Sequence, residues 1–205
     1  MNNLFSRLSG QPAAVLALVA VFCLILFLLR IRRVRLTPRM TACSGLMIAL
    51  SILLGTFPFY RMPNGGSVTL GGMLPLMLLA FAYGPEIGML AGFTYGLVDL
   101  VMEPYLLHPV QVLFDYPLPF MALGICGYFP GHRNWGMAAA VSLRFLFHFL
   151  SGVVFFGSYA PAGQSVCLYS FLTNLTYLLP NFVICLLLSR MLPIDRFIRS
   201  MQGGA

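Results

Sequence analysis

A carboxylate followed by two prolines is the stretch of this sequence whose residue types most plainly do chemistry. Asp115 begins the run Asp115-Tyr116-Pro117-Leu118-Pro119 inside a long apolar segment. An ionisable group at membrane depth costs about 2.5–3.5 kcal/mol on insertion scales, so it marks a functional site with a nearby partner. Each proline removes a backbone donor, and such backbone is tolerated in a membrane only inside protein or beside a cavity. The run therefore predicts one wall of a polar pocket.

Four more polar residues are expected to share this pocket with Asp115. Tyr116 follows it directly, His148 lies on a separate apolar segment, and Tyr169 and Asn174 lie on the last one. A lone histidine in a helix is more often a satisfied core residue, but an embedded carboxylate needs donors close by. Small-molecule pockets are mostly apolar with a few placed polar groups. Convergence from three helices therefore favours a binding site over separate core hydrogen bonds.

Two further carboxylates, Asp99 and Glu103, are candidates for the rim of the pocket. They continue a segment with glycines at positions 84, 88, 92 and 96, a spacing that predicts close helix packing. The carboxylates are either solvated at the membrane interface or form a negative mouth that attracts a cation. Arg144 is expected to snorkel toward the cytoplasmic side, which leaves the outer region negative. A cationic ligand with a hydrogen-bonding ring would suit such a site, with aromatic faces adding cation–π contacts.

The composition indicates a polytopic membrane protein. Of the 205 residues, 60% are hydrophobic and only 8% are charged, whereas soluble domains carry about 25% charged residues. The net charge of +7 does not indicate nucleic acid, because every basic residue is an arginine and most lie beside predicted spans, where they set topology. The five scattered cysteines form no CxxC and no Cys/His metal spacing, so no metal site is expected.

Seven spans are expected to position these residues in an all-α integral membrane protein. A run of about 20 apolar residues crosses a bilayer core, and the expected spans are residues 12–31, 40–57, 69–83, the glycine-bearing segment, 110–128, 137–156 and 166–191. Residues 58–67 and 157–165 are read as outer loops, with turn chemistry at 64–66, and residues 130–135 as a cytoplasmic turn in which Trp135 anchors the interface. Arginines at 30–39 and 190–199 place the N-terminus outside and the C-terminus inside.

The second span carries small residues at a spacing that brings helices together. Gly45 and Ala49 are four residues apart and share one helix face. A small-x-x-x-small pair lets another helix approach closely in lipid. Packing within the bundle and docking to another subunit both remain open from the residues alone.

At the candidate site residues the sequence resembles a known family, the thiamine-specific substrate-binding (S) components of energy-coupling factor transporters, or ThiT/YuaJ family. The matching pieces are residues 65–71 (GGSVTLG) with 73–75 (MLP), residues 108–111 (HPVQ) with 115–118 (DYPL), residues 144–152 (RFLFHFLSG), and Tyr169-Ser170 with Asn174. The likeness runs in order over about residues 40–192.

The resemblance implies a six-helix substrate-binding membrane domain at residues 40–192. Residues 1–39 would add an N-terminal transmembrane helix with an Arg-rich cytoplasmic linker, and residues 193–205 would form a cytoplasmic tail. Such a subunit resides in the bacterial cytoplasmic membrane, binds thiamine from outside and is not an enzyme. It works with a transmembrane coupling subunit and two cytoplasmic ATPases, which use ATP, and binds no cofactor itself.

The resemblance also implies roles for individual residues. Asp115 would hold the aminopyrimidine of thiamine by hydrogen bonds, and the residues at Tyr116, His148, Tyr169 and Asn174 would contact the ligand. Two positions where some members stack thiamine on tryptophan fall near Gly66 and on Phe156 in this sequence. The coupling subunit would dock on the face of Gly45 and Ala49.

Other functions remain as alternatives. A stand-alone secondary transporter or channel for a small cationic solute would use Asp115 and His148 as a relay, but the sequence shows no internal repeat. An S component for another vitamin is a second alternative. An integral membrane enzyme is disfavoured, because no metal triad, activated nucleophile or phosphate loop is apparent.

Overall fold

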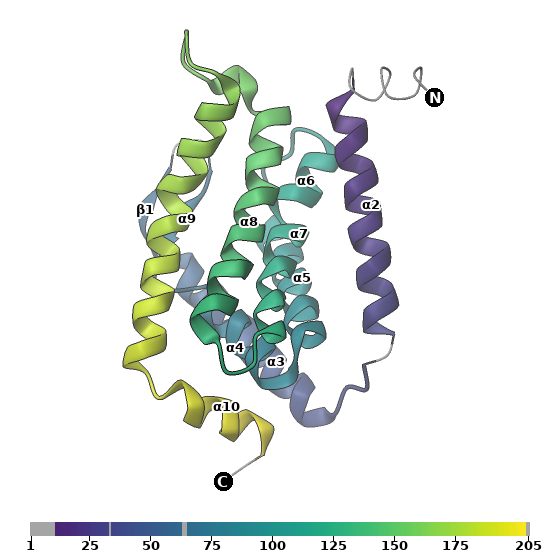
Figure 1. The fold of residues 1–205 in the computed structure, drawn as a ribbon, viewed down its shortest axis with the longest axis vertical. Coiled ribbons are helices and arrows are strands. Elements are labelled where there is room, and N and C mark those ends of the chain that lie inside the picture. Colours follow the sequence, from purple (N-terminus) through teal and green to yellow (C-terminus); the bar gives the residue numbers. More distant parts are fainter. Residues whose placement is uncertain (1–10, 33, 63–64, 204–205) are drawn as a thin grey trace.

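The computed structural model describes residues 11–32, 34–62 and 65–203, which fold mainly into helices (Figure 1). The expectations for the first ten residues, for Arg33 and for the turn residue Asn64 lie outside the described residues. In chain order the elements are α2 (Pro12–Ile31), α3 (Pro38–Thr56), β1 (Pro58–Arg61), β2 (Ser67–Thr69), α4 (Leu74–Tyr83), α5 (Pro85–Met102), α6 (Pro109–Asp115), α7 (Pro117–Met121), η1 (Ala122–Tyr128), α8 (Arg133–Phe155), η2 (Gly157–Tyr159), α9 (Val166–Met191) and α10 (Ile194–Gln202).

Within the described ranges, five helical segments are long and apolar enough to cross a membrane: α2, α3, residues 109–128, α8 and α9. The bounds of α2 and α9 are those predicted from the sequence. Helix α8 begins at Arg133, so residues 133–135 form its first turn. The prediction that these residues belong to a turn is therefore wrong, and Trp135 lies exposed in the first turn of α8.

The prediction of a full-length span over residues 69–83 is also wrong. Helix α4 has 10 residues, a length of about 15 Å, half of a bilayer core. The preceding residues Ser67–Thr69 pair antiparallel with Pro58–Arg61, so the expected outer loop is partly a β-hairpin. Pro75 falls in the first turn of α4, where a proline is accommodated without loss of a helical hydrogen bond. Neither α4 nor α5 is among the five candidate spans.

Helix α4 forms the centre of the bundle, and α5 packs closely against the elements around it. All residues from Leu74 to Ala80 are buried. The glycines of α5 face backbone: a Cβ on Gly96 would lie 2.6 Å from the Tyr116 carbonyl oxygen, and a Cβ on Gly92 would overlap the Phe120 carbonyl. The predicted close packing is confirmed at Gly88, Gly92 and Gly96, whereas Gly84 lies in the turn before α5 and makes no such contact.

The expected tail contains a further helix, α10, that lies against α3 and α4. Tyr83 Oη donates to the Met201 carbonyl at 2.6 Å, and Arg39 Nε donates to the same carbonyl at 2.8 Å. Gln202 Nε2 donates to the Ala82 carbonyl at 2.7 Å. The start of α2 and the end of α10 lie at opposite ends of the molecule (Figure 1).

Candidate ligand-binding site

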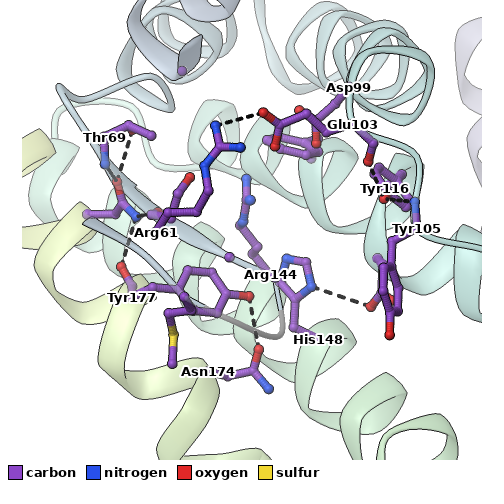
Figure 2. Close-up of a pocket in the computed structure, with 18 of the residues that line it drawn as sticks. Arg61, Thr69, Asp99, Glu103, Tyr105, Tyr116, Arg144, His148, Asn174 and Tyr177 are labelled. Atoms are coloured by element: carbon purple, nitrogen blue, oxygen red, sulfur yellow. Dashed lines mark hydrogen bonds and ion pairs between the residues drawn. The ribbon is translucent and has the colours of Figure 1, made fainter. Parts of the chain in front are cut away.

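A cavity of about 750 Å³ lies between α3, α5, α6, α8, α9 and the hairpin (Figure 2). All nine residues proposed from the sequence for the pocket and its rim line this cavity: Gly66, Asp99, Glu103, Asp115, Tyr116, His148, Phe156, Tyr169 and Asn174. Their shared location is a structural finding, whereas their roles toward a ligand stay a prediction. The two proposed docking residues, Gly45 and Ala49, are exposed on α3 and do not line it.

The broken helix predicted at Asp115 is confirmed. Helix α6 ends at Asp115, Tyr116 leaves helical geometry with φ −115° and ψ −81°, and α7 starts at Pro117. The prolines cannot donate to the turn before them, and the Phe120 amide reaches the Tyr116 carbonyl only at 3.5 Å. The break leaves the carboxylate at the cavity wall, while Gly96 of α5 packs against the same carbonyl from behind.

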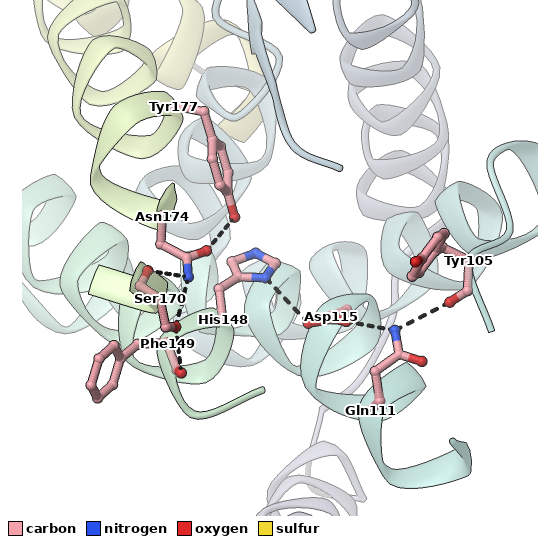
Figure 3. A network of polar contacts seen from close by, with 8 residues as sticks. All are labelled: Tyr105, Gln111, Asp115, His148, Phe149, Ser170, Asn174 and Tyr177. Carbon is pink, nitrogen blue, oxygen red and sulfur yellow. Dashed lines mark hydrogen bonds and ion pairs between the residues drawn. The ribbon is translucent and has the colours of Figure 1, made fainter. Parts of the chain in front are cut away.

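The Asp115 carboxylate is held between two helices. His148 Nδ1 lies 3.7 Å from one carboxylate oxygen, and Gln111 Nε2 donates to the other at 2.5 Å (Figure 3). Gln111 is itself fixed, because Nε2 also donates to the Tyr105 carbonyl at 3.1 Å and Oε1 accepts from the Leu107 amide at 3.0 Å. Sequence reasoning missed this role of Gln111, although its position four residues before Asp115 was the available signal.

Aromatic groups build the wall next to the break. The Tyr116 hydroxyl donates to the Glu103 carbonyl at 2.8 Å and accepts from the Tyr105 amide at 2.9 Å. Phe156 stacks on Tyr105 with ring centroids 5.8 Å apart. The Tyr105 and Tyr159 hydroxyls share a hydrogen bond of 2.7 Å, which raises the pKa of Tyr105 above its ordinary value. Tyr116 thus fixes the shape of the connection between α5 and α6.

Helix α9 supplies a second polar network on the other side of His148 (Figure 3). The Tyr177 hydroxyl donates to Asn174 Oδ1 at 2.9 Å, and Asn174 Nδ2 donates to the Ser170 carbonyl at 2.9 Å. The Tyr177 ring also fills the space beside Gly66, where an added Cβ would lie 2.8 Å from ring carbons. Gly66 has φ +86°, so a glycine suits both the turn and the close ring contact.

Asn181, one turn further along α9, ties the hairpin to the helix. Its Nδ2 donates to the Ser67 carbonyl at 2.7 Å, and its Oδ1 accepts from the Thr69 amide at 3.0 Å. Neither Tyr177 nor Asn181 was predicted to belong to the pocket. Tyr177 lies three residues and Asn181 seven residues after Asn174, and this spacing is the signal that places all three on one face.

Arg144 lines the cavity, so the prediction that it snorkels is wrong. The residue is 8% exposed, and its guanidinium carbon lies 3.9 Å from the centroid of the Phe120 ring. Figure 2 shows it between the α9 side chains and the tyrosines of the opposite wall. The face that carries Arg144 and His148 turns inward because α8 packs between α9 and η1. The side chain therefore has no short path to either end of the bundle.

The charge of the lining is more balanced than the sequence analysis expected. Three carboxylates, Asp99, Glu103 and Asp115, share the cavity with the guanidiniums of Arg61 and Arg144. At the mouth, Arg61 pairs with Glu103 at 2.8 Å, and both side chains are exposed. An excess of one carboxylate remains. Among the described residues no three His, Cys, Asp or Glu side chains gather as metal ligands would.

Comparisons with known proteins agree with this architecture. Residues 41–199 match the family model described as thiamine transporter protein (Thia_YuaJ). The chain is 38% identical over 163 residues to the thiamine transporter ThiT of Bacillus subtilis strain 168, covering 71% of this chain and 82% of that protein. It is 29% identical over 123 residues to the thiamine transporter ThiT of Lacticaseibacillus paracasei, covering 50% of this chain and 61% of that protein.

A solved structure of ThiT from Listeria monocytogenes superimposes with a TM-score of 0.69 at 23% identity. The match covers 78% of this chain and 96% of that chain. The likeness shows that the two proteins share a fold. Helix α2 precedes residue 41, where the family match begins.

Proposed function

The chain belongs to the Thia_YuaJ family of thiamine transporter proteins, and from this premise we propose that it is the thiamine-binding S component of an energy-coupling factor transporter. It is a multi-pass membrane protein of a transporter family and not an enzyme. The observation that carries the proposal is the carboxylate of Asp115 at the break of a helix, paired with His148 and Gln111 beside a cavity of about 750 Å³.

The cavity offers complementary groups for each part of thiamine. The aminopyrimidine has an exocyclic amine donor and ring nitrogen acceptors, which suit the Asp115 carboxylate and the ring nitrogens of His148. A charge-assisted hydrogen bond to the carboxylate is about twice as strong as a neutral one. His148 Nε2 is buried without a hydrogen-bond partner in the described part of the chain, so a donor or an acceptor of the ligand would satisfy it, depending on the tautomer.

The thiazolium ring carries a permanent positive charge. The carboxylates exceed the guanidiniums of the lining by one, and the stacked rings of Phe156 and Tyr105 line the same cavity. A cation over an aromatic face gains about 0.5–2 kcal/mol, depending on desolvation. Phe156 thus takes the stacking role that the family resemblance assigns to this position, and the Tyr177 ring occupies the space beside Gly66.

A binding subunit that depends on partners must present a surface away from its own cavity. Helix α3 has one buried residue, Ser51, and Gly45 and Ala49 lie on its exposed side. We assign this face to the transmembrane coupling subunit, while two cytoplasmic ATPase subunits bind the ATP. In this arrangement the start of α2 lies on the outer side of the cytoplasmic membrane, and α10 lies on its cytoplasmic side. Thiamine then enters from the outer side.

Titration calorimetry of the purified full-length chain with thiamine, riboflavin and biotin, without ATP, tests this function. Thiamine binding without binding of the other two vitamins is the expected result. Binding of riboflavin or biotin instead would assign the chain to another vitamin. Thiamine uptake by liposomes that contain this chain alone would favour a stand-alone transporter, in which the Asp115–His148 pair at 3.7 Å would act as the relay.

A further inference from the structure

Helix α2 precedes the residues that match the family, yet it packs against the helices that carry the site. It lies along α5, α6 and α8 (Figure 1). Three of its residues are buried, Leu16, Ala20 and Phe27, whereas most of the others face outward. The buried side is therefore a narrow line of contact directed at the bundle.

The two halves of α2 contact different partners. Phe27 stacks on Phe93 of α5 with centroids 5.4 Å apart, and Arg30 lies 3.5 Å from Glu86 at the start of α5. Ala20 lies about 10 Å from Phe27 along the helix, and α2 also contacts α6, which lies beside its first half in Figure 1. The second half is thus anchored to α5, and the first half covers the broken helix.

The covered cluster lies directly behind the Asp115–His148 pair. Leu16, Ala20 and Phe27 share one apolar cluster with Phe114, Leu118, Met121, Ala122 and Phe147. Phe114 precedes Asp115, and Phe147 precedes His148. The two phenylalanine rings meet edge to face at 5.5 Å, while the carboxylate and the imidazole lie 3.7 Å apart. A displacement of Phe114 therefore displaces the Asp115 carboxylate relative to His148.

The broken helix depends on its neighbours for a fixed position. Helix α6 has seven residues and α7 has five, too few to be stable alone, and the break between them lacks proline donors. Helices α5 and α8 support it from inside the bundle. The remaining side of the broken helix would otherwise face lipid tails, which are as apolar as its side chains, so burial there contributes little to stability. What another helix adds on that side is close packing.

We propose that α2 is a positioning element that holds α6 against α8, so that the Asp115 carboxylate keeps its place beside His148. The inference rests on the proposed function, because Asp115 is assigned to the ligand there. It gives a role to the helix that precedes the family match. Residues of α2 act only through α6 and touch no ligand.

A double-mutant cycle in the full-length chain tests this role. Ala20 is fully buried and Val21 is 52% exposed, so Ala20→Phe pushes α2 from α6, and Val21→Phe is a matched control facing outward. We expect Ala20→Phe to weaken thiamine binding about tenfold, whereas the affinity of the Val21→Phe control should stay within about twofold of the unmodified chain. In an Asp115→Asn background, Ala20→Phe should have little further effect on thiamine affinity. An equal loss in both backgrounds, or no loss at all, would overturn the proposal.

Hydrogen exchange of the ligand-free protein separates this inference from the proposed function. Ala20→Phe should speed the exchange of amides in residues 109–121, while amide exchange in α9 stays unchanged. Unchanged exchange in residues 109–121 would refute the positioning role even if thiamine binds. Failure of the unmodified chain to bind thiamine would refute only the proposed function. If Ala20→Phe does not insert, Leu16→Ala serves the same two measurements, with the same outcomes decisive.

Discussion

The two sides of the cavity use their polar groups differently. On the α9 side, the polar groups form hydrogen bonds with one another, with their own helix and with the hairpin; these groups belong to Asn174, Tyr177 and Asn181. On the α8 side, His148 Nε2 and two guanidinium nitrogens of Arg144 have no hydrogen-bond partner within the described ranges. A buried polar atom without a partner costs about 1–3 kcal/mol. The α9 side therefore shapes the cavity, and the side formed by α6 and α8 is the one that a ligand can stabilise.

The largest expected effect is a loss of uptake after a substitution on the docking face of α3. This effect distinguishes the docking face from the two sides of the cavity. Ala49→Trp places a bulky group on the exposed face of α3, and close packing is what drives helix contacts in lipid. We expect ATP-dependent thiamine uptake with the coupling module to be lost, with binding to the purified chain near normal. Leu172→Trp, at an exposed position of α9, is the matched control. Preserved uptake by inserted Ala49→Trp would move the docking face elsewhere.

The next largest effect should come from the α6 side. Asp115→Asn keeps the shape of the side chain but removes its charge, and hydrogen bonds to charged groups contribute about 1.5–3 kcal/mol. We expect thiamine affinity to fall by roughly 10- to 150-fold in calorimetry. Asp195→Asn, whose carboxylate pairs with Arg133 away from the cavity, controls for a general loss of negative charge. Unchanged affinity in Asp115→Asn would remove Asp115 from the ligand site.

On the α9 side we expect stability to change more than affinity. Asn181→Ala removes the side chain that bonds Ser67 and Thr69 and leaves partly buried hairpin groups unpaired, which lowers the free energy of unfolding by up to about 1–3 kcal/mol. Thiamine affinity should fall less than in Asp115→Asn. Thr176→Ala, an exposed position on the same helix, is the control in thermal unfolding. A larger affinity loss in Asn181→Ala than in Asp115→Asn would reverse the assigned roles of the two sides.

The smallest effect is expected at the mouth. Glu103 and Arg61 form an ion pair whose side chains are 60% and 55% exposed, and exposed pairs contribute about 0–1 kcal/mol. Glu103→Gln should therefore change thiamine affinity by less than about fivefold, and added salt should shrink the difference further. A loss as large as that of Asp115→Asn would show that Glu103 contacts the ligand directly.

Local chemistry made several features predictable from the sequence. The bounds of α2 and α9 follow from uninterrupted apolar runs, and the break after Asp115 follows from prolines that cannot donate hydrogen bonds. The close packing of α5 follows from its glycine spacing, because the absence of a side chain is itself the property that matters. The motifs around Asp115 and His148 also carried the family resemblance, which the comparisons confirm.

Other features depended on contacts between distant segments. Thr69 was predicted to start an apolar span, but Ser67–Thr69 pairs with Pro58–Arg61 and is held by Asn181. The two strands are neighbours along the chain, but Asn181 lies more than a hundred residues beyond Ser67 and Thr69, and no local pattern records that contact.

The sequence by itself determined the properties that depend on single residues and their neighbours along the chain. These are the lengths of apolar segments, the helix breaks and the close packing at glycines. What only the tertiary structure decided was which side of each helix faces inward. In a soluble helix the apolar face marks the interior, but a membrane helix is apolar toward lipid and toward protein alike. The placement of α2 behind Asp115 therefore follows from packing among helices, because no difference in hydrophobicity between the faces of α2 specifies it.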